Sequence, residues 1–139
     1  MKMYLKERCE TVEYAAEELK KYVVTMSRGA IHPTVTDAYE DNSDGITLGT
    51  LEQLSLDTSD LTDPTTEDIV DADVVNGVGY LAGSNHRSIL FAVYKYCASL
   101  GCRYLRPGPD GDYIPKADVP HHVYRYRKNL LRGDHRALF

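Results

Sequence analysis

The sequence contains no tryptophan and three cysteines among its 139 residues. Cys9, Cys97 and Cys102 make an odd number, and their spacing lacks the close pairs of a zinc site. Cys97 falls on the apolar face of an expected helix and Cys102 begins an expected strand, so both are predicted to be small buried hydrophobic residues. A disulfide between these two residues is the alternative. The sequence thus predicts neither a metal nor a cofactor.

Long hydrophobic runs are also missing. No apolar stretch approaches the roughly 20 residues that cross a bilayer, and the N-terminus, MKMYLKER, lacks the apolar core of a signal peptide. These absences predict no membrane partner and favour a cytoplasmic location. The length of the chain is enough for one domain with a substantial core.

Lysine and arginine are absent between Arg28 and Arg87, a region rich in aspartate and glutamate. The net charge is −5, and the balance turns basic only after Arg103, where the chain ends with Arg125, Arg127, Lys128, Arg132 and Arg136. One interpretation is a solvated acidic surface; the other is an acidic face and a basic tail that bind each other or oppositely charged partners. The overall sign argues against nucleic acid as a partner.

Hydrophobic periodicity predicts two helices. In residues 11–26 the apolar positions fall on one face, with charged residues opposite. The second helix follows Gly83-Ser84-Asn85, where Ser84 or Asn85 can cap it, and it ends at Gly101. Its apolar face contains Ile89, Leu90, Val93, Cys97 and Leu100.

Short strands are predicted around these helices. The expected strands are residues 3–6, 34–36, 45–49, 79–82, 102–105, 113–115 and 123–126, and residues 73–82 are expected to form a hairpin or one interrupted strand. A short helix is expected around residues 51–56, before Pro64 stops helix formation. The pattern predicts an α+β fold: a two-layer α/β sandwich whose mixed sheet carries both main helices on one face.

The most suggestive local feature is Ser84, Asn85, His86 and Arg87 at a strand-to-helix turn. Free N–H groups and the helix dipole can hold an anion there, and His86 or Arg87 can add positive charge. The turn has neither the P-loop ending nor the glycine spacing of a dinucleotide site. The alternative is an ordinary capped helix start. These four residues are the candidate ligand-binding site.

Other groupings of polar residues predict no catalytic residue. Two aspartate triplets, at 57, 60 and 63 and at 68, 71 and 73, do not have calcium-loop spacing and are interpreted as loop surface. His32, His121 and His122 have no partner at ligand spacing, and no Ser-His-Asp or Cys-His signature is present. The tyrosines near the C-terminal half can stack on sugar rings, although packing explains them equally well.

Two stretches resemble a known family. Residues 12–26 read VEYAAEELKKYVVTM, and residues 79–115 include AGSNHRSILFAVYKYCASLGCRYLRPGPDGDYIP, with the strand ITLG between them. Their order resembles the N-terminal, non-catalytic domain of α-glucuronidases of glycoside hydrolase family 67, and the second domain of β-N-acetylhexosaminidases has the same fold. The resemblance covers roughly residues 10–116.

This resemblance implies a two-layer sandwich that precedes a catalytic TIM barrel. Residues 1–123 would be the accessory domain, and residues 124–139 would lead toward the barrel, whose catalytic acids lie outside this sequence. Tyr104 stands where the family usually has tryptophan, and the final HRALF departs from a barrel strand. The expected function is a non-catalytic accessory domain of a carbohydrate-active hydrolase, with the barrel and carbohydrate as partners. The alternative is a stand-alone module that binds a small anion or acidic sugar.

Overall fold

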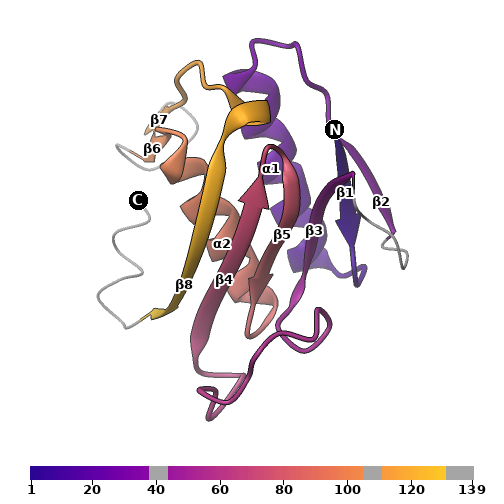
Figure 1. Cartoon of the computed structure of the whole chain (residues 1–139), viewed down its shortest axis with the longest axis vertical. Coiled ribbons are helices and arrows are strands. Elements are labelled where there is room, and N and C mark those ends of the chain that lie inside the picture. The colour runs from indigo at the N-terminus through magenta and orange to yellow at the C-terminus, as the bar shows by residue number, and fades with distance from the viewer. Residues whose placement is uncertain (38–43, 105–110, 131–139) are drawn as a thin grey trace.

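The computed structural model describes residues 1–37, 44–104 and 111–130 (Figure 1). The elements in chain order are β1 (Lys2–Leu5), α1 (Glu10–Met26), β2 (Thr34–Asp37), β3 (Gly45–Thr50), β4 (Asp68–Val75), β5 (Val78–Gly83), α2 (His86–Ser99), β6 (Arg103–Tyr104), β7 (Asp112–Tyr113), the 3-10 helix η2 (Val119–His121) and β8 (Val123–Leu130). Within these residues, neither α-helix has the length and apolarity needed to cross a bilayer.

Six strands form one mixed sheet in the order β2-β1-β3-β5-β4-β8. Strands β2, β1, β3 and β5 run parallel, whereas β4 pairs antiparallel with both β5 and β8. Strands β4 and β5 form a hairpin because Asn76 and Gly77 both adopt a positive φ, of 54° and 79°, which suits a two-residue hairpin turn. The short strands β6 and β7 form a separate antiparallel pair.

Both helices cover the same face of the sheet (Figure 1). The buried residues of α1 recur at helical spacing: Val12, Ala15, Ala16, Leu19, Tyr22, Val23 and Met26. They pack with alternate residues of the parallel strands, among them Met3, Leu5, Ile46 and Leu48. Full burial of one such large side chain contributes about 1.5–3 kcal/mol, so this contact between layers supplies much of the stability of the fold.

Helix α2 begins directly after β5 and lies very close to it. Asn85 caps the helix, since its side chain accepts a hydrogen bond from the backbone N–H of Ser88 at 2.9 Å. A Cβ atom on Gly83 would lie 2.4 Å from Cβ of Ser88. Glycine is therefore required at this position for the helix to start so near the strand.

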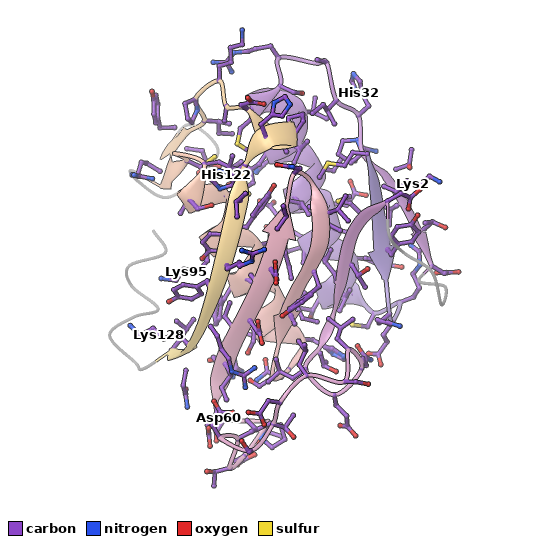
Figure 2. The ribbon with its side chains drawn as sticks, in the orientation of Figure 1. Lys2, His32, Asp60, Lys95, His122 and Lys128 are labelled. Atoms are coloured by element: carbon purple, nitrogen blue, oxygen red, sulfur yellow. The ribbon has the colours of Figure 1, made fainter. Side chains whose placement is uncertain are left out.

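The opposite face of the sheet is covered in part by the connection between β3 and β4. Leu51, Ile69 and Ala82 form a second buried cluster, against which Leu54, Leu56, Leu61 and Tyr80 pack. Arg127 of β8 fastens the connection, because its guanidinium donates to the carbonyl of Asp57 at 2.6 Å and to Asp60 at 2.8 Å. Figure 2 shows Asp60 on this connection, beyond the ends of the strands.

The edge strand β8 joins the basic and acidic parts of the chain. Arg127 pairs with Asp71 at 2.7 Å, and Arg125 pairs with Asp73 at 3.3 Å. On the other side of β8, Tyr124 and Tyr126 stack on each other and pack against the core. Lys95 of α2 lies beside β8 (Figure 2), with Nζ 5.8 Å from the centre of the Tyr126 ring. Part of the acidic face and part of the basic tail thus bind each other.

The predicted fold class is confirmed, including both helices on one face of a mixed sheet. The hairpin interpretation of residues 73–82 is also correct, although β4 begins earlier, at Asp68. Cys97 and Cys102 are buried and free, as small hydrophobic residues. The strand predicted at 102–105 is the two-residue β6, which is outside the main sheet.

The short helix predicted at residues 51–56 is wrong. Residues 51–55 form turns, and Ser55 adopts a positive φ of 55°, which a helix does not allow. Leu51 is instead part of the second buried cluster, and Leu54 and Leu56 pack against that cluster. Residues 124–130 belong to β8, so the segment predicted to lead toward a barrel begins as the edge of the sheet. The last residue of the strand predicted at 102–105 and the final HRALF lie outside the described residues.

Candidate functional site

The carboxyl ends of β1, β3 and β5 meet at one edge of the sheet, because these neighbouring strands are parallel. Ligand sites in α/β proteins commonly lie outside such strand ends. The chain leaves β1 toward Glu7 and Cys9, leaves β3 toward Gln53, and leaves β5 toward His86. Residues that are far apart in the sequence therefore lie together at this edge.

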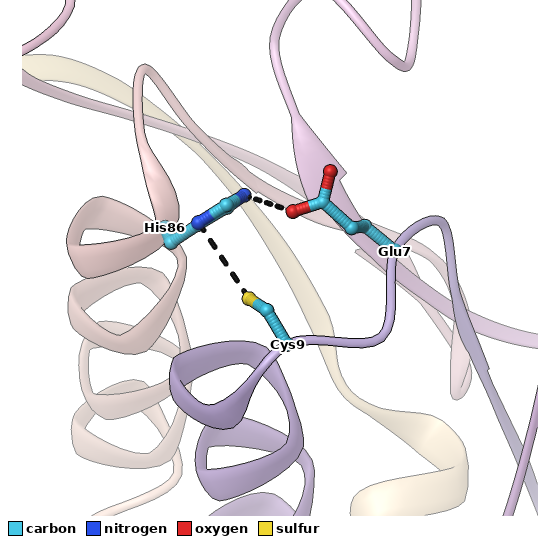
Figure 3. Close-up of side chains that lie close together, drawn as sticks. All are labelled: Glu7, Cys9 and His86. Atoms are coloured by element: carbon cyan, nitrogen blue, oxygen red, sulfur yellow. Dashed lines mark hydrogen bonds and ion pairs between the residues drawn. The ribbon is translucent and has the colours of Figure 1, made fainter.

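His86 lies between Glu7 and Cys9 (Figure 3). Its Nε2 is 2.6 Å from Oε2 of Glu7, and its Nδ1 is 3.5 Å from Sγ of Cys9. Cys9 is the N-cap of α1 and His86 is the first residue of α2, so two helix starts hold the pair. The side chains of His86 and Glu7 are 40% and 42% exposed. This cluster, Glu7, Cys9 and His86, is open to solvent.

Gln53 supports the carboxylate of the cluster from the end of β3. Its Nε2 donates to Oε1 of Glu7 at 3.4 Å. Gln53 is itself held, since its side-chain Oε1 accepts from the backbone N–H of Thr50 at 2.9 Å and its backbone N–H donates to the Thr50 hydroxyl at 3.2 Å. One oxygen of the Glu7 carboxylate thus contacts Gln53, which follows β3, while the other oxygen contacts His86.

Two kinds of chemistry are open to this cluster. Thiolate, imidazole and carboxylate are all zinc ligands, and one ligand atom from each residue lies within 4.8 Å of the other two. The same three groups in a line form a thiol, a base and an orienting acid, which is the arrangement of an activated nucleophile.

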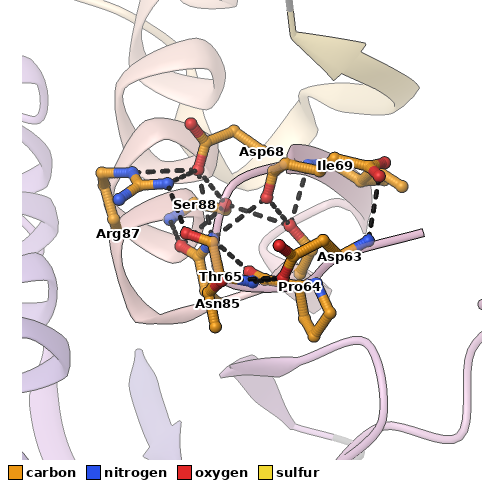
Figure 4. A network of polar contacts seen from close by, with 10 residues as sticks. Asp63, Pro64, Thr65, Asp68, Ile69, Asn85, Arg87 and Ser88 are labelled. Carbon is orange, nitrogen blue, oxygen red and sulfur yellow. Dashed lines mark hydrogen bonds and ion pairs between the residues drawn. The ribbon is translucent and has the colours of Figure 1, made fainter. Parts of the chain in front are cut away.

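The predicted site residues Asn85 and Arg87 belong to a different network (Figure 4), to which Ser84 is joined through its contact with Ser88. Ser84 is buried, and its hydroxyl donates to the carbonyl of Glu67 at 2.6 Å while it accepts from the N–H of Ile69 at 2.9 Å. Asn85 donates to the carbonyls of Pro64 and Glu67, at 2.8 and 3.0 Å. These bonds fasten the start of α2 to the segment that enters β4.

The buried carboxylate of Asp68 is the centre of this network. Its Oδ1 accepts from Ser88 Oγ at 2.7 Å, from Arg87 Nε at 3.0 Å and from Asn85 Nδ2 at 3.3 Å. Burial acts to raise the pKa of Asp68, but the hydrogen bonds from Ser88 and Arg87 outweigh burial and hold that pKa below its ordinary value. The site is therefore occupied by an internal anion.

An external anion at residues 84–87 stays a prediction, against which two features weigh. Ser84, Asn85 and Arg87 already bind protein groups, and the negative charge of Asp68 opposes a second negative charge nearby. His86 is the exception, because it faces Glu7 and Cys9 instead. The cap that the sequence predicted is confirmed at Asn85.

Sequence reasoning missed Glu7 and Cys9 because 77 positions separate Cys9 from His86. A signal was available, since Cys9 follows the first strand and His86 follows a later one, and parallel neighbours would bring both to one edge. Whether Cys9 and His86 meet depends on the order of the strands in the sheet, and the sequence pattern does not show that order.

The interpretation of the aspartate triplets as loop surface is confirmed for Asp57, Asp60 and Asp63. It is wrong for Asp68, Asp71 and Asp73, which lie in β4, and Asp68 is buried. Asp57 and Asp63 accept hydrogen bonds from backbone N–H groups two residues further on, as in Asx turns. In the second triplet, Asp71 and Asp73 pair with arginines of β8.

Comparison with known proteins adds no family to these observations. No protein-family model matches this chain, and no curated protein sequence matches it either. The fold and the geometry of its surface are therefore the basis on which a function is inferred.

Proposed function

We propose that this chain is a non-catalytic accessory domain of a carbohydrate-active hydrolase of the α-glucuronidase type, and that it packs against a catalytic barrel. The segments that resemble such domains coincide with α1, with β3 and with the unit from β5 through α2 to β7. These elements make up the helix-covered layer of the sandwich. The resemblance and the fold thus support each other, since the similar segments contribute part of the core, including the buried residues of both helices.

One surface carries the proposal. Val75 of β4 lies opposite Val78 of β5 and Val123 of β8, so the three side chains share one face across three strands. They lie on the face opposite the helices, because the neighbouring Val74 points into the core. Val78 and Val123 are 38% and 53% exposed. We call these three residues the valine surface.

A cavity extends this surface. It has a volume of about 270 Å³ and is lined by Met1, Ile31, Val78, Val119 and Pro120, with Asn76, Gly77 and Asp44 at its polar side. Exposed apolar residues that adjoin an apolar hollow are typical of a surface that binds another domain. In this proposal a barrel, joined to the same polypeptide, covers the valine surface.

The proposal is tested first by the native polypeptide. An antibody raised against this chain, followed by intact mass measurement, should identify a product several hundred residues longer, and that product should hydrolyse α-glucuronosyl substrates. A product of the same length as this chain would refute the accessory role.

A substitution tests the surface itself. Val123→Asp should cost little in the isolated chain, where Val123 is already exposed, but should destabilise the native polypeptide by about 1–3 kcal/mol if the interface buries the new carboxyl group. Tyr14→Asp is the matched control, because Tyr14 is 52% exposed and lies on α1, away from the valine surface. Equal effects of Val123→Asp in the two proteins would contradict a buried valine surface.

A further inference from the structure

We infer that Cys9 is a nucleophilic thiol, activated by His86 and positioned through Glu7, that undergoes exchange with small disulfides. This inference is independent of the accessory role, since it concerns the edge of the sheet where β1, β3 and β5 end. It assigns a site for reversible thiol modification, and the class of its ligand is a low-molecular-weight disulfide.

The hydrogen-bonding capacities of the three groups determine the direction of proton transfer. A carboxylate only accepts, so the imidazole nitrogen beside Glu7, Nε2, carries the ring proton. Nδ1 is then the accepting nitrogen, and it is the one that lies 3.5 Å from Sγ of Cys9. His86 is therefore placed to remove the thiol proton as the sulfur attacks. Gln53 and Glu7 fix the ring orientation that this transfer needs.

The start of α1 favours negative charge on the sulfur. Cys9 is the N-cap residue of this helix, and its side chain makes no capping hydrogen bond. The first N–H groups of a helix lack partners within the helix and carry partial positive charge. Negative charge that develops on Sγ during attack is therefore stabilised by backbone dipoles that are already in position.

The geometry favours a nucleophile over a metal centre. One metal ion binds only one nitrogen of an imidazole ring, but here Nδ1 faces Cys9 and Nε2 faces Glu7. An ion on Nδ1 would thus have two of the three residues as ligands in the present arrangement, and Glu7 would act from behind the ring. A stable zinc site with a catalytic position takes three protein ligands.

The proposed step is a thiol–disulfide exchange. The sulfur of Cys9 attacks one sulfur of a disulfide R–S–S–R, the S–S bond breaks, and a Cys9–S–S–R bond forms while R–S⁻ leaves. The proton passes from Sγ to Nδ1 of His86 and then to the leaving thiolate, or to water when that thiolate is an aromatic one and too weak a base to take it. No electron acceptor other than the disulfide is needed, and a second thiol reverses the reaction.

The open position of the cluster suits this reaction. Cys9 is half-buried, whereas Cys97 and Cys102 are buried in the core. Burial raises the pKa of both core thiols, that of Cys102 to about 11. Only Cys9 among the three therefore combines access to solvent with an adjacent base, which makes the other two internal controls.

The test follows the reaction of the folded chain with an aromatic disulfide whose released thiolate absorbs visible light. The wild-type chain should release one equivalent rapidly, and peptide mapping should place the label on Cys9; the core cysteines should react only after denaturation. His86→Phe should slow the rapid phase at least about tenfold, a bound set below the roughly 10²–10⁴ that a positioned base provides. His121→Phe is the matched control and should leave the rate unchanged, since His121 is exposed on η2 and pairs with Asp118.

Two further variants separate positioning from folding. Glu7→Ala should slow the rapid phase, while Glu7→Gln should restore most of it, because the amide oxygen still accepts from Nε2. Circular dichroism checks that each variant is folded. A folded His86→Phe chain that reacts at the wild-type rate would overturn the inference. Stoichiometric Zn²⁺ binding that requires Cys9, His86 and Glu7 and blocks the label would also overturn it, in favour of a metal site.

Discussion

Replacement of Asp68 by asparagine tests whether the network at the start of α2 is a structural element of the fold. Asp68 is 3% exposed, and its Oδ1 accepts hydrogen bonds from Ser88, Arg87 and Asn85. Asparagine has nearly the same shape and can still offer an oxygen, but it removes the negative charge. The substitution thus isolates the contribution of charge to the bonds.

The expected loss of stability follows from the type of each hydrogen bond that Asp68 accepts. Hydrogen bonds to charged groups contribute about 1.5–3 kcal/mol, against about 0.5–1.5 kcal/mol for neutral ones. Ser88 is fully buried and should lose the whole difference, whereas Arg87 is half-exposed and is partly compensated by water. We expect Asp68→Asn to lower the free energy of unfolding by about 2 kcal/mol. With a urea slope of roughly 1–3 kcal/mol per molar, the midpoint should fall by about 1 M.

Urea unfolding followed by circular dichroism measures this change, with Asp118→Asn as the control. Asp118 is 68% exposed and pairs with His121 on the surface, so its replacement should shift the free energy of unfolding by no more than about 0.5 kcal/mol. If the two variants are equally stable, the network does not stabilise the start of α2.

The effect of pH provides a second check. The pKa of Asp68 is lowered in the folded chain, so its stabilising contribution is present above the ordinary carboxyl pKa and is lost as the pH falls through the folded value. The difference in stability between the wild-type chain and Asp68→Asn should therefore be full at neutral pH and shrink in acid. A difference that stays constant down to strongly acidic pH would contradict the role of charge.

Five further substitutions test packing, a buried hydroxyl and ion pairs, and thermal or urea unfolding measures each. Gly79→Ala should cost about 3 kcal/mol or more, because its φ is 146° and a Cβ would lie 1.8 Å from a carbonyl oxygen of β4. Gly77→Ala should cost about 1–2 kcal/mol, because its φ is 79° but a Cβ would meet only Cε of Met1, at 4.0 Å. Equal costs would refute the steric argument. Tyr96→Phe should raise stability by about 1 kcal/mol, since the buried hydroxyl has no hydrogen-bond partner in the described part of the chain; a loss of stability would point to a partner. Arg127→Ala should cost about 2 kcal/mol and Arg125→Ala about 0.5 kcal/mol or less, because the first arginine makes several bonds and the second is largely exposed. Similar losses of stability in the two arginine variants would contradict the role of Arg127 in holding the connection between β3 and β4.

The helices were predictable because each has one apolar face of the right period. Residues 11–26 cover almost all of α1, and a cap at Ser84 or Asn85 could be predicted from their position before the second apolar pattern; the structure has it at Asn85. The apolar positions of this pattern are the ones that the core buries: Val12, Leu19 and Val23 are all fully buried.

The segment from residue 51 to 56 was mispredicted because leucine spacing does not distinguish a helix from a loop that packs. Leu51 is buried against Ile69 and Ala82 on the face of the sheet opposite the helices. A local pattern cannot show that β4 and β5 would present an apolar platform there. Tertiary contacts, and not helix propensity, determine the shape of this connection.

The candidate thiol site illustrates the other limit. No residue adjacent to Cys9 or His86 in the sequence marks either of them as part of a site. Both come to the same edge of the sheet because β3 lies between β1 and β5 and the three strands are parallel. Likewise, the sequence that predicts an anion site at residues 84–87 does not reveal that the buried carboxylate of Asp68 accepts hydrogen bonds from Arg87 and Ser88 there.

The central claim is that another domain of the same polypeptide covers the valine surface. Hydrogen–deuterium exchange tests it most directly, by comparing the isolated chain with the native polypeptide. We predict that amides of the turn between β4 and β5 and of the first residues of β8 exchange at least about tenfold more slowly in the native polypeptide, while those around Tyr14 on α1 are unchanged. Identical exchange of the valine surface in both would contradict the accessory role.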